Sequence, residues 1–227
     1  MIPIRDEIKT HRTPIVNYAL VVINVLVFLW MFLNSGNLES IYYEYALIPS
    51  NFLNGIDLGD VKDIFTSMFM HGGWMHLIGN MLYLWIFGDN IEDRLGHIGY
   101  LIFYLAGGIA AALLQTLISP SSQIPMVGAS GAIAGVLGAY LVMYPNSRVY
   151  TFIPIGFYAR VRLVPAVVVL GLWFLLQLIS GVGSLGALDQ GGTAYFAHIG
   201  GFIFGLIVGW MFKRRGREPQ PAPPSWA

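Results

Sequence analysis

The sequence predicts an all-α, polytopic membrane protein, built as a bundle of six transmembrane helices with a long first external loop. Three observations lead to this fold class. The 227-residue chain is 56% hydrophobic and only 11% charged, whereas soluble domains carry roughly 25% charged residues. The hydrophobic residues gather into six segments, and the basic residues lie almost entirely on one side of them. Such a composition suits contact with lipid rather than with water.

The six apolar segments differ in length. A helix needs about 20 residues to cross a hydrocarbon core of about 30 Å. The first, third and sixth segments meet this length, while the second and fourth look short. The fourth begins beside Ser130, so we expect its start to lie below the membrane surface, in a hydrated depression. In order, the segments cover residues 15–33, 75–87, 98–118, 131–144, 163–179 and 194–212.

The distribution of basic residues predicts the orientation. All but one of the 12 Lys and Arg residues fall in the two tails and in the second and fourth loops; the exception is Lys62, in the first loop. Cytoplasmic loops are enriched in basic residues, so we expect both termini in the cytoplasm and the Ser130 end of the fourth segment at the outer face.

The same pattern divides the chain into three parts. We expect residues 1–14 to form a cytoplasmic tail and residues 15–213 to form the six-helix membrane domain. Residues 214–227 include four prolines and read as a disordered cytoplasmic tail. The first loop, residues 34–73, contains aromatic, amphipathic stretches of the kind that lie among lipid headgroups.

Ser130 is the first candidate for chemistry. A serine at the start of a helix usually caps free backbone N–H groups. Here the neighbours in Gly128-Ala129-Ser130-Gly131 are small, which leaves the hydroxyl uncovered. Glycines also follow at helical spacing, at 131, 135 and 138, and such a stripe lets another helix come close.

His198 is the natural partner of Ser130. Ionisable side chains within membrane spans are rare, costly and usually functional. Gly201 and Gly205 follow at i+3 and i+7, on the same helix face as the histidine. Packing this face against the glycine stripe that starts at Gly131 would bring the imidazole to the Ser130 hydroxyl. A neutral imidazole can then act as a general base for a serine nucleophile.

A third polar group lies on the second segment. His76 and Asn80 are four residues apart, so they share a helix face. Both can donate a hydrogen bond while neutral, as stabilisation of an oxyanion requires, and the Ser130 backbone N–H at a helix N-terminus can add another donor. The alternative is hydrogen bonding between helices. We expect His71 to support the loop that enters this helix.

Other catalytic chemistries fit the sequence poorly. Cysteine is absent, which excludes a thiolate nucleophile, and there is no His-Glu-x-x-His zinc motif. None of the six apolar segments contains Asp or Glu, and the nearest acid to His198 is Asp189, nine residues earlier. A Ser–His dyad is therefore favoured over a triad, and the group that orients the imidazole is left unnamed.

At this point the chain resembles a rhomboid intramembrane serine protease of the bacterial six-span form. The resemblance rests on three motifs, which occur in the family's order on segments two, four and six. They are the stretch from His71 to Asn80, Gly128-Ala129-Ser130-Gly131, and Ala197-His198-Ile199-Gly200-Gly201 with Gly205. The similarity spans residues 15–212, nearly the whole chain.

The resemblance implies roles for these residues. Ser130 would be the nucleophile and His198 the base, with His76 and Asn80 at the oxyanion site and His71, Gly131, Gly201 and Gly205 in support. Glu92 resembles the acid that holds the cytoplasmic end of the second helix. Many members stack an aromatic residue from four positions after the serine onto the imidazole, but this chain has Ala134 there. We therefore expect either that another side chain holds His198 or that the ring is held less firmly.

The resemblance also implies an activity and a location. The family cleaves transmembrane segments of other membrane proteins and needs no cofactor or metal. We expect transmembrane-helix substrates, contact with the lipid bilayer, no nucleic-acid partner and a place in the bacterial inner membrane. Two other functions stay open: a non-catalytic rhomboid-like protein that binds membrane clients, and a small channel or transporter. The absence of carboxylates from the apolar segments and of an internal repeat argues against the latter.

Overall fold

The computed structural model describes residues 1–55, 57–155, 158–186 and 192–213. Within them the chain forms eight α-helices and one three-stranded sheet. The helices are α1 (Ile15–Leu33), α2 (Leu38–Tyr45), α3 (Leu58–Ser67), α4 (Trp74–Leu95), α5 (His97–Ile118), α6 (Ser130–Met143), α7 (Ala166–Ser184) and α8 (Tyr195–Phe212). The strands are β1 (Ile2–Asp6), β2 (Arg148–Ile155) and β3 (Tyr158–Pro165).

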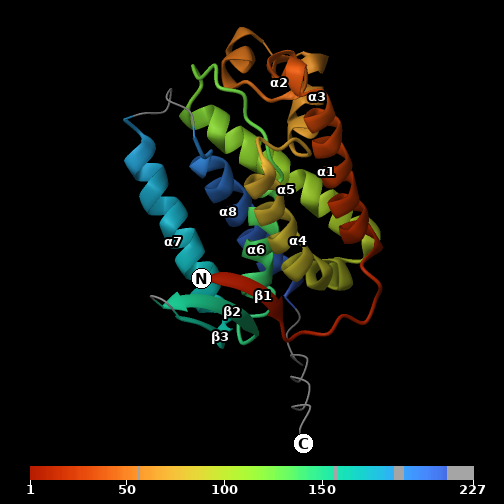
Figure 1. Cartoon of the computed structure of the whole chain (residues 1–227), viewed down its shortest axis with the longest axis vertical. Helices are drawn as coiled ribbons and strands as arrows, with labels where there is room; N and C mark the ends of the chain where they lie inside the picture. Colours follow the sequence, from red (N-terminus) through yellow and green to blue (C-terminus); the bar gives the residue numbers. More distant parts are fainter. Residues whose placement is uncertain (56, 156–157, 187–191, 214–227) are drawn as a thin grey trace, which may run out of the picture.

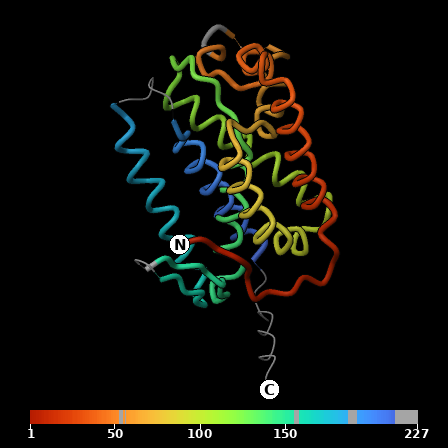
Figure 2. Tube along the Cα trace, viewed as in Figure 1, coloured from red at the N-terminus to blue at the C-terminus, as the bar shows by residue number. Residues whose placement is uncertain are grey.

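The long helices run up and down through one bundle. Figure 1 shows α6 and α8 in its interior, with α7 at one edge and α1 towards the opposite edge. The short helices α2 and α3 cover one end, and the sheet covers the other. Figure 2 shows that the N-terminus and the end of α8 both lie at the sheet end. This arrangement agrees with a chain that crosses a membrane several times.

Among the described residues, four helices are long and apolar enough to cross a membrane: α1, α5, α7 and α8. The protein is therefore a multi-pass helical membrane protein, while the count of six spans stays a prediction. Helix α6 has 14 residues and is as short as expected. The second segment was expected to be short, but the helix that contains it, α4, has 22 residues. The hydropathy pattern missed the last two turns of α4 because the helix continues through the polar residues after Phe87.

Helix α6 is the centre of the core. Eleven of its 14 residues are buried, and its most extensive packing is against α8. Glycines bring the two backbones together: a Cβ atom on Gly205 would lie 1.9 Å from the carbonyl oxygen of Gly135. The predicted pairing of the two glycine stripes is thus present, with Gly131 against Gly201 in the same contact.

The sheet was not predicted. Strand β2 pairs antiparallel with both β1 and β3, so the segment expected to be a cytoplasmic tail contains a strand. Asp6 at the end of β1 accepts hydrogen bonds from the Tyr140 hydroxyl of α6 at 2.7 Å and from the Asn90 amide of α4 at 2.8 Å. Burial raises the pKa of Asp6 to about 6. The N-terminal strand is therefore anchored to the same helix that begins at Ser130.

Glu92 joins α4 to the start of α1, as its family position implies. Its carboxylate is 1% exposed and accepts hydrogen bonds from the backbone N–H groups of Val16 at 2.9 Å and Asn17 at 2.7 Å. The first N–H groups of a helix have no partner within the helix and favour a negative charge. The buried carboxylate satisfies both requirements and fixes α1 against α4.

Candidate active site

Ser130 is the first residue of α6. The chain from 119 to 129 descends into the bundle before α6 begins (Figure 1), so this helix starts inside the molecule. The preceding residue, Ala129, is the N-cap, and no side chain caps the helix. The hydroxyl of Ser130 therefore does not serve as a helix cap, which was the simplest alternative for a serine at this position.

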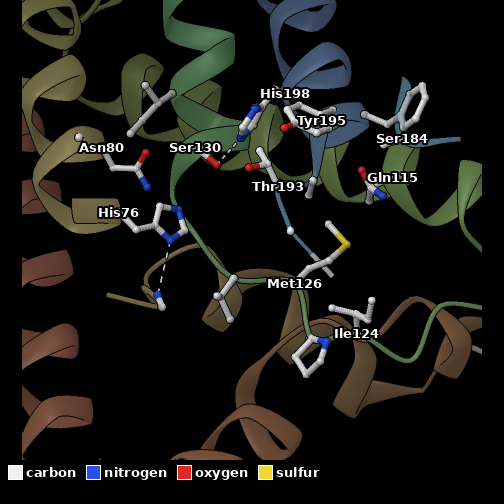
Figure 3. A pocket seen from close by; sticks show the side chains of 18 of the residues that line it. His76, Asn80, Gln115, Ile124, Met126, Ser130, Ser184, Thr193, Tyr195 and His198 are labelled. Atoms are coloured by element: carbon white, nitrogen blue, oxygen red, sulfur yellow. Dashed lines mark hydrogen bonds between the residues drawn. The ribbon is translucent and has the colours of Figure 1, made fainter. Parts of the chain in front are cut away.

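The hydroxyl of Ser130 is hydrogen-bonded to His198. The Ser130 Oγ atom lies 2.7 Å from Nε2 of His198, and Figure 3 shows the two side chains facing each other across this contact. His198 lies in the first turns of α8 and is 8% exposed. Residues 68 positions apart are thus brought together by the packing of α6 on α8. The contact has the geometry of a nucleophile with its general base.

The other ring nitrogen of His198 contacts α7. Nδ1 lies 2.8 Å from Oε1 of Gln177, and the ring of Trp173 packs beside the imidazole with 5.8 Å between the ring centroids. These two side chains answer the open question of what holds the histidine, given Ala134. Asp189, the acid nearest to His198 in sequence, lies outside the described residues.

The turn before Ser130 positions His76. Gly128 has φ +131°, a conformation that favours glycine. A Cβ atom there would lie 2.8 Å from Nε2 of His76 and 3.5 Å from the Ser130 Oγ atom, so the missing side chain leaves the space between them open. The Gly72 N–H group donates a long hydrogen bond, 3.5 Å, to Nδ1 of His76. With Nδ1 accepting, Nε2 carries the proton and can donate towards Ser130.

Asn80 is fixed by His71. The Asn80 amide nitrogen lies 2.9 Å from Nε2 of His71, which is 1% exposed. The rings of His71 and His76 also pack edge to face, with centroids 5.0 Å apart. His71 therefore contacts both polar residues of α4, and its supporting role stays a prediction. An amide has two N–H donors, so one of those on Asn80 stays available to the cavity.

A cavity of about 770 Å³ contains these groups. Its lining includes Ser130, His198, His76 and Asn80 together with Trp173 of α7. Figure 3 shows Ser130 and His198 on one side, with His76 and Asn80 extending from α4 beside them. The four polar residues thus converge on one space large enough for a peptide segment. Within the described part of the chain, no three His, Cys, Asp or Glu side chains are grouped as metal ligands.

The family model named Rhomboid domain matches residues 58–215, which include the four polar residues of the cavity just described. The chain belongs to the rhomboid family. The family resemblance drawn from the three motifs is therefore confirmed, as is the helical, polytopic fold class.

This rhomboid chain is similar in sequence to three named relatives. It is 31% identical over 225 residues to Rhomboid protein 1, mitochondrial, of Saccharomyces cerevisiae, covering 94% of the chain and 59% of the relative. It is 30% identical over 196 residues to Rhomboid protease GluP of Bacillus subtilis, with 86% and 35% covered. The match to RHOMBOID-like protein 1 of Arabidopsis thaliana is 33% identical over 157 residues, with 69% and 36% covered. The rhomboid chain thus spans between about a third and three fifths of the length of these relatives.

Sequence reasoning missed three residues around Ser130 and His198 of this rhomboid chain. Gln177 and Trp173 lie in an apolar run, where neither carried a motif. Gln115 of α5 accepts a hydrogen bond from the Ala197 N–H at 3.1 Å and so holds the first turn of α8 next to His198. A signal was present: Gln177 and Gln115 are isolated strongly polar residues in membrane helices, and such residues usually have a partner.

Proposed function

We propose that this chain is an intramembrane serine endopeptidase that cleaves transmembrane segments of other membrane proteins. The observation that carries the proposal is the 2.7 Å contact between the Ser130 hydroxyl and Nε2 of His198, within a cavity of a rhomboid-family membrane protein. Ser130 acts as the nucleophile and His198 as the general base. The protease relative from Bacillus subtilis supports the same reaction class.

The reaction starts with attack by Ser130 on the scissile carbonyl carbon. As the bond from Oγ forms, the hydroxyl proton passes to Nε2 of His198, which becomes an imidazolium. The tetrahedral intermediate collapses when the imidazolium returns this proton to the leaving amine, and an acyl-enzyme remains. Water then attacks the ester carbonyl while His198 takes its proton. The imidazolium returns this proton to the Ser130 Oγ atom as the acyl–oxygen bond breaks, which restores the hydroxyl and releases the carboxylic acid.

The oxyanion of the intermediate is stabilised by neutral donors. The Nε2–H group of His76 and the second amide N–H of Asn80 extend into the cavity from α4, and the Ser130 backbone N–H adds a third donor. Fixed donors in a site shielded from water stabilise developing charge without reorganising. The turn at Gly128 serves this role because it keeps the space between His76 and Ser130 free.

The substrate is a helix that enters from lipid and unwinds locally, since a carbonyl in an intact helix is shielded by its own hydrogen bond. The enzyme resides in the bacterial inner membrane, with both termini in the cytoplasm. The site opens to the outer face through the end covered by α2 and α3. The grouping of basic residues supports this orientation.

Incubation of the purified chain in liposomes with a panel of transmembrane substrates tests the proposal. We expect cleavage within or beside a transmembrane segment, and none with Ser130→Ala, whose circular dichroism and thermal unfolding should match those of the wild type. Cleavage by Ser130→Ala at the wild-type rate would refute the assignment. Tight binding of the panel without any cleavage would favour the non-catalytic alternative.

A further inference from the structure

Gln177 is the strongly polar residue of an otherwise apolar stretch of α7. Its neighbours from Ala166 to Ile179 are apolar, and the helix is one of the four that can span a membrane. A polar side chain in such a helix normally finds a partner on another helix. Here the partner is His198, whose Nδ1 atom lies 2.8 Å from the amide oxygen of Gln177.

This contact favours one of the two neutral tautomers of His198. An amide oxygen only accepts hydrogen bonds, so Nδ1 must be the donor and hold the hydrogen atom. A neutral imidazole has one N–H, and Nε2 is therefore left with a free lone pair. That lone pair faces the Ser130 hydroxyl at 2.7 Å. The opposite tautomer would present an N–H to the serine and could not accept its proton.

Trp173 restricts the movement of the His198 ring from a second side. It lies one helical turn before Gln177, on the same face of α7. Its ring packs beside the His198 imidazole, with ring centroids 5.8 Å apart. Next to it, Phe174 stacks on Phe202 of α8 with centroids 4.2 Å apart and planes within 12°. One face of α7 therefore holds both the imidazole and the helix that carries it.

We propose that Gln177 is the positioning residue of the dyad, taking the place that an acid holds in a Ser–His–Asp triad. It orients His198 and selects the tautomer protonated at Nδ1. When Nε2 takes the Ser130 proton, the Nδ1–H group of the resulting imidazolium keeps donating to the Gln177 oxygen. No proton moves to Gln177. This inference rests on the proposed function, because it assigns a role in the same reaction.

Three substitutions at position 177 separate positioning from packing. Gln177→Leu keeps the approximate side-chain volume but removes the hydrogen-bond acceptor. Gln177→Asn keeps the amide on a side chain that is one methylene shorter. Gln177→Glu keeps an acceptor oxygen on a side chain of the same length. Misplacement of a catalytic group by about 1 Å can cost about 100-fold in rate. We expect Gln177→Leu and Gln177→Asn to lower kcat about 10- to 100-fold with KM nearly unchanged. Gln177→Glu should retain most of the activity.

Leu176→Ala is the matched control. Leu176 is the preceding residue of α7 and is 53% exposed on the outside of the bundle. Its substitution should leave kcat and KM within twofold of the wild type. The proposal is overturned if Gln177→Leu also stays within twofold, or if its loss of kcat is matched by Leu176→Ala. A wild type that cleaves in a Ser130-dependent way while Gln177→Leu is unimpaired refutes this inference alone.

The tautomer can also be measured without substrate. Solid-state NMR of the full chain in lipid, labelled with ¹⁵N at histidine, distinguishes protonated from unprotonated ring nitrogens. The signals lost in His198→Ala identify this residue. We expect Nδ1 protonated and Nε2 unprotonated in the wild type, with the second tautomer appearing in Gln177→Leu. A wild-type His198 protonated at Nε2, or identical spectra for the two proteins, would overturn the proposal whatever the protein cleaves.

Discussion

Gly201 of α8 lies directly on the carbonyl oxygen of Gly131 in α6: a Cβ atom at position 201 would be 1.9 Å from that oxygen. The contact involves backbone rather than a flexible side chain, so the two helices can keep their distance only while position 201 has no side chain. Gly131 directly follows Ser130, and Gly201 lies three residues after His198. The distance between Ser130 and His198 therefore depends on a glycine that touches neither of them.

We predict that Gly201→Ala separates α6 from α8. Overpacking of this kind costs about 1–3 kcal/mol, and the shift should break the dyad contact and abolish cleavage. Gly171→Ala on α7 is the control, because a Cβ atom there meets nothing within 4 Å and alanine favours the helix. Thermal unfolding and cleavage rates check both variants. If Gly201→Ala matched the control in both, the close packing would not be essential.

A second prediction concerns the turn before Ser130. Gly128→Ala introduces a side chain at φ +131° and 2.8 Å from the His76 ring. Such backbone strain costs about 1–3 kcal/mol, and the ring must leave the space beside Ser130. We expect cleavage to fall by at least about tenfold, since one lost oxyanion donor costs about 10²–10³ in kcat.

Gly73→Ala serves as the comparison for Gly128→Ala. Position 73 has an extended backbone, with φ 170°, and a methyl group added there would enter open space, because nothing lies within 4 Å of its Cβ position. Steady-state kinetics on one substrate should show nearly normal turnover for this variant. Normal turnover for Gly128→Ala as well would mean that His76 is not needed in its observed place.

Asp6 should make the free energy of unfolding depend on pH. Burial raises the pKa of this carboxyl from 3.8 to about 6, so between about pH 4 and pH 6 the folded protein holds a proton that the unfolded chain has released. The contribution of Asp6 to stability therefore falls as pH rises through this window and stays low above it. Asparagine can accept the same hydrogen bonds without the charge.

We expect Asp6→Asn to be more stable than the wild type above pH 6, with the difference shrinking towards pH 4. Thermal unfolding in detergent from pH 4 to pH 8 measures this difference. Glu7→Gln removes a charge from the adjacent residue and reports the effect of net charge alone. A constant difference between Asp6→Asn and the wild type across the range would show that the buried carboxyl does not titrate there.

Substitution of Glu92 should lower the stability of the fold without changing the cleavage reaction. In Glu92→Gln, one of the two oxygens that accept from Val16 and Asn17 becomes an NH₂ group that faces a donor. A buried donor left unsatisfied costs about 1–3 kcal/mol. We expect a lower unfolding temperature but normal cleavage well below it. Asp93→Asn, which alters an exposed contact to the Arg12 N–H, should have a smaller effect.

Much of the site could be predicted because it depends on local spacing. The glycine stripes of α6 and α8 predicted that Ser130 and His198 meet, and the short fourth segment predicted a helix that starts inside the bundle. Gln177 could not be paired with His198 in advance. Its contact depends on the rotation of α7 against α8, which the apolar sequence of α7 does not determine.

The sheet and the end of α4 were missed for a different reason. Hydropathy identifies segments that lie in lipid, whereas both of these features lie where the chain leaves it. The β2 sequence Arg148–Ile155 has β-branched and aromatic residues typical of a strand. Its partner β1 is more than 140 positions away, and only the folded bundle brings the two together. Asp6, which is hydrogen-bonded to Tyr140, was therefore assigned only to the N-terminal tail.

Labelling with a fluorophosphonate probe, followed by mass spectrometry of the adduct, tests the Ser130–His198 dyad most directly. The hydroxyl reacts with such a probe only when a base takes its proton. We expect a single adduct on Ser130 in the wild type and its loss in His198→Ala, with the fold of the variant unchanged. An adduct on another residue, or equal labelling of Ser130 without His198, would contradict the account.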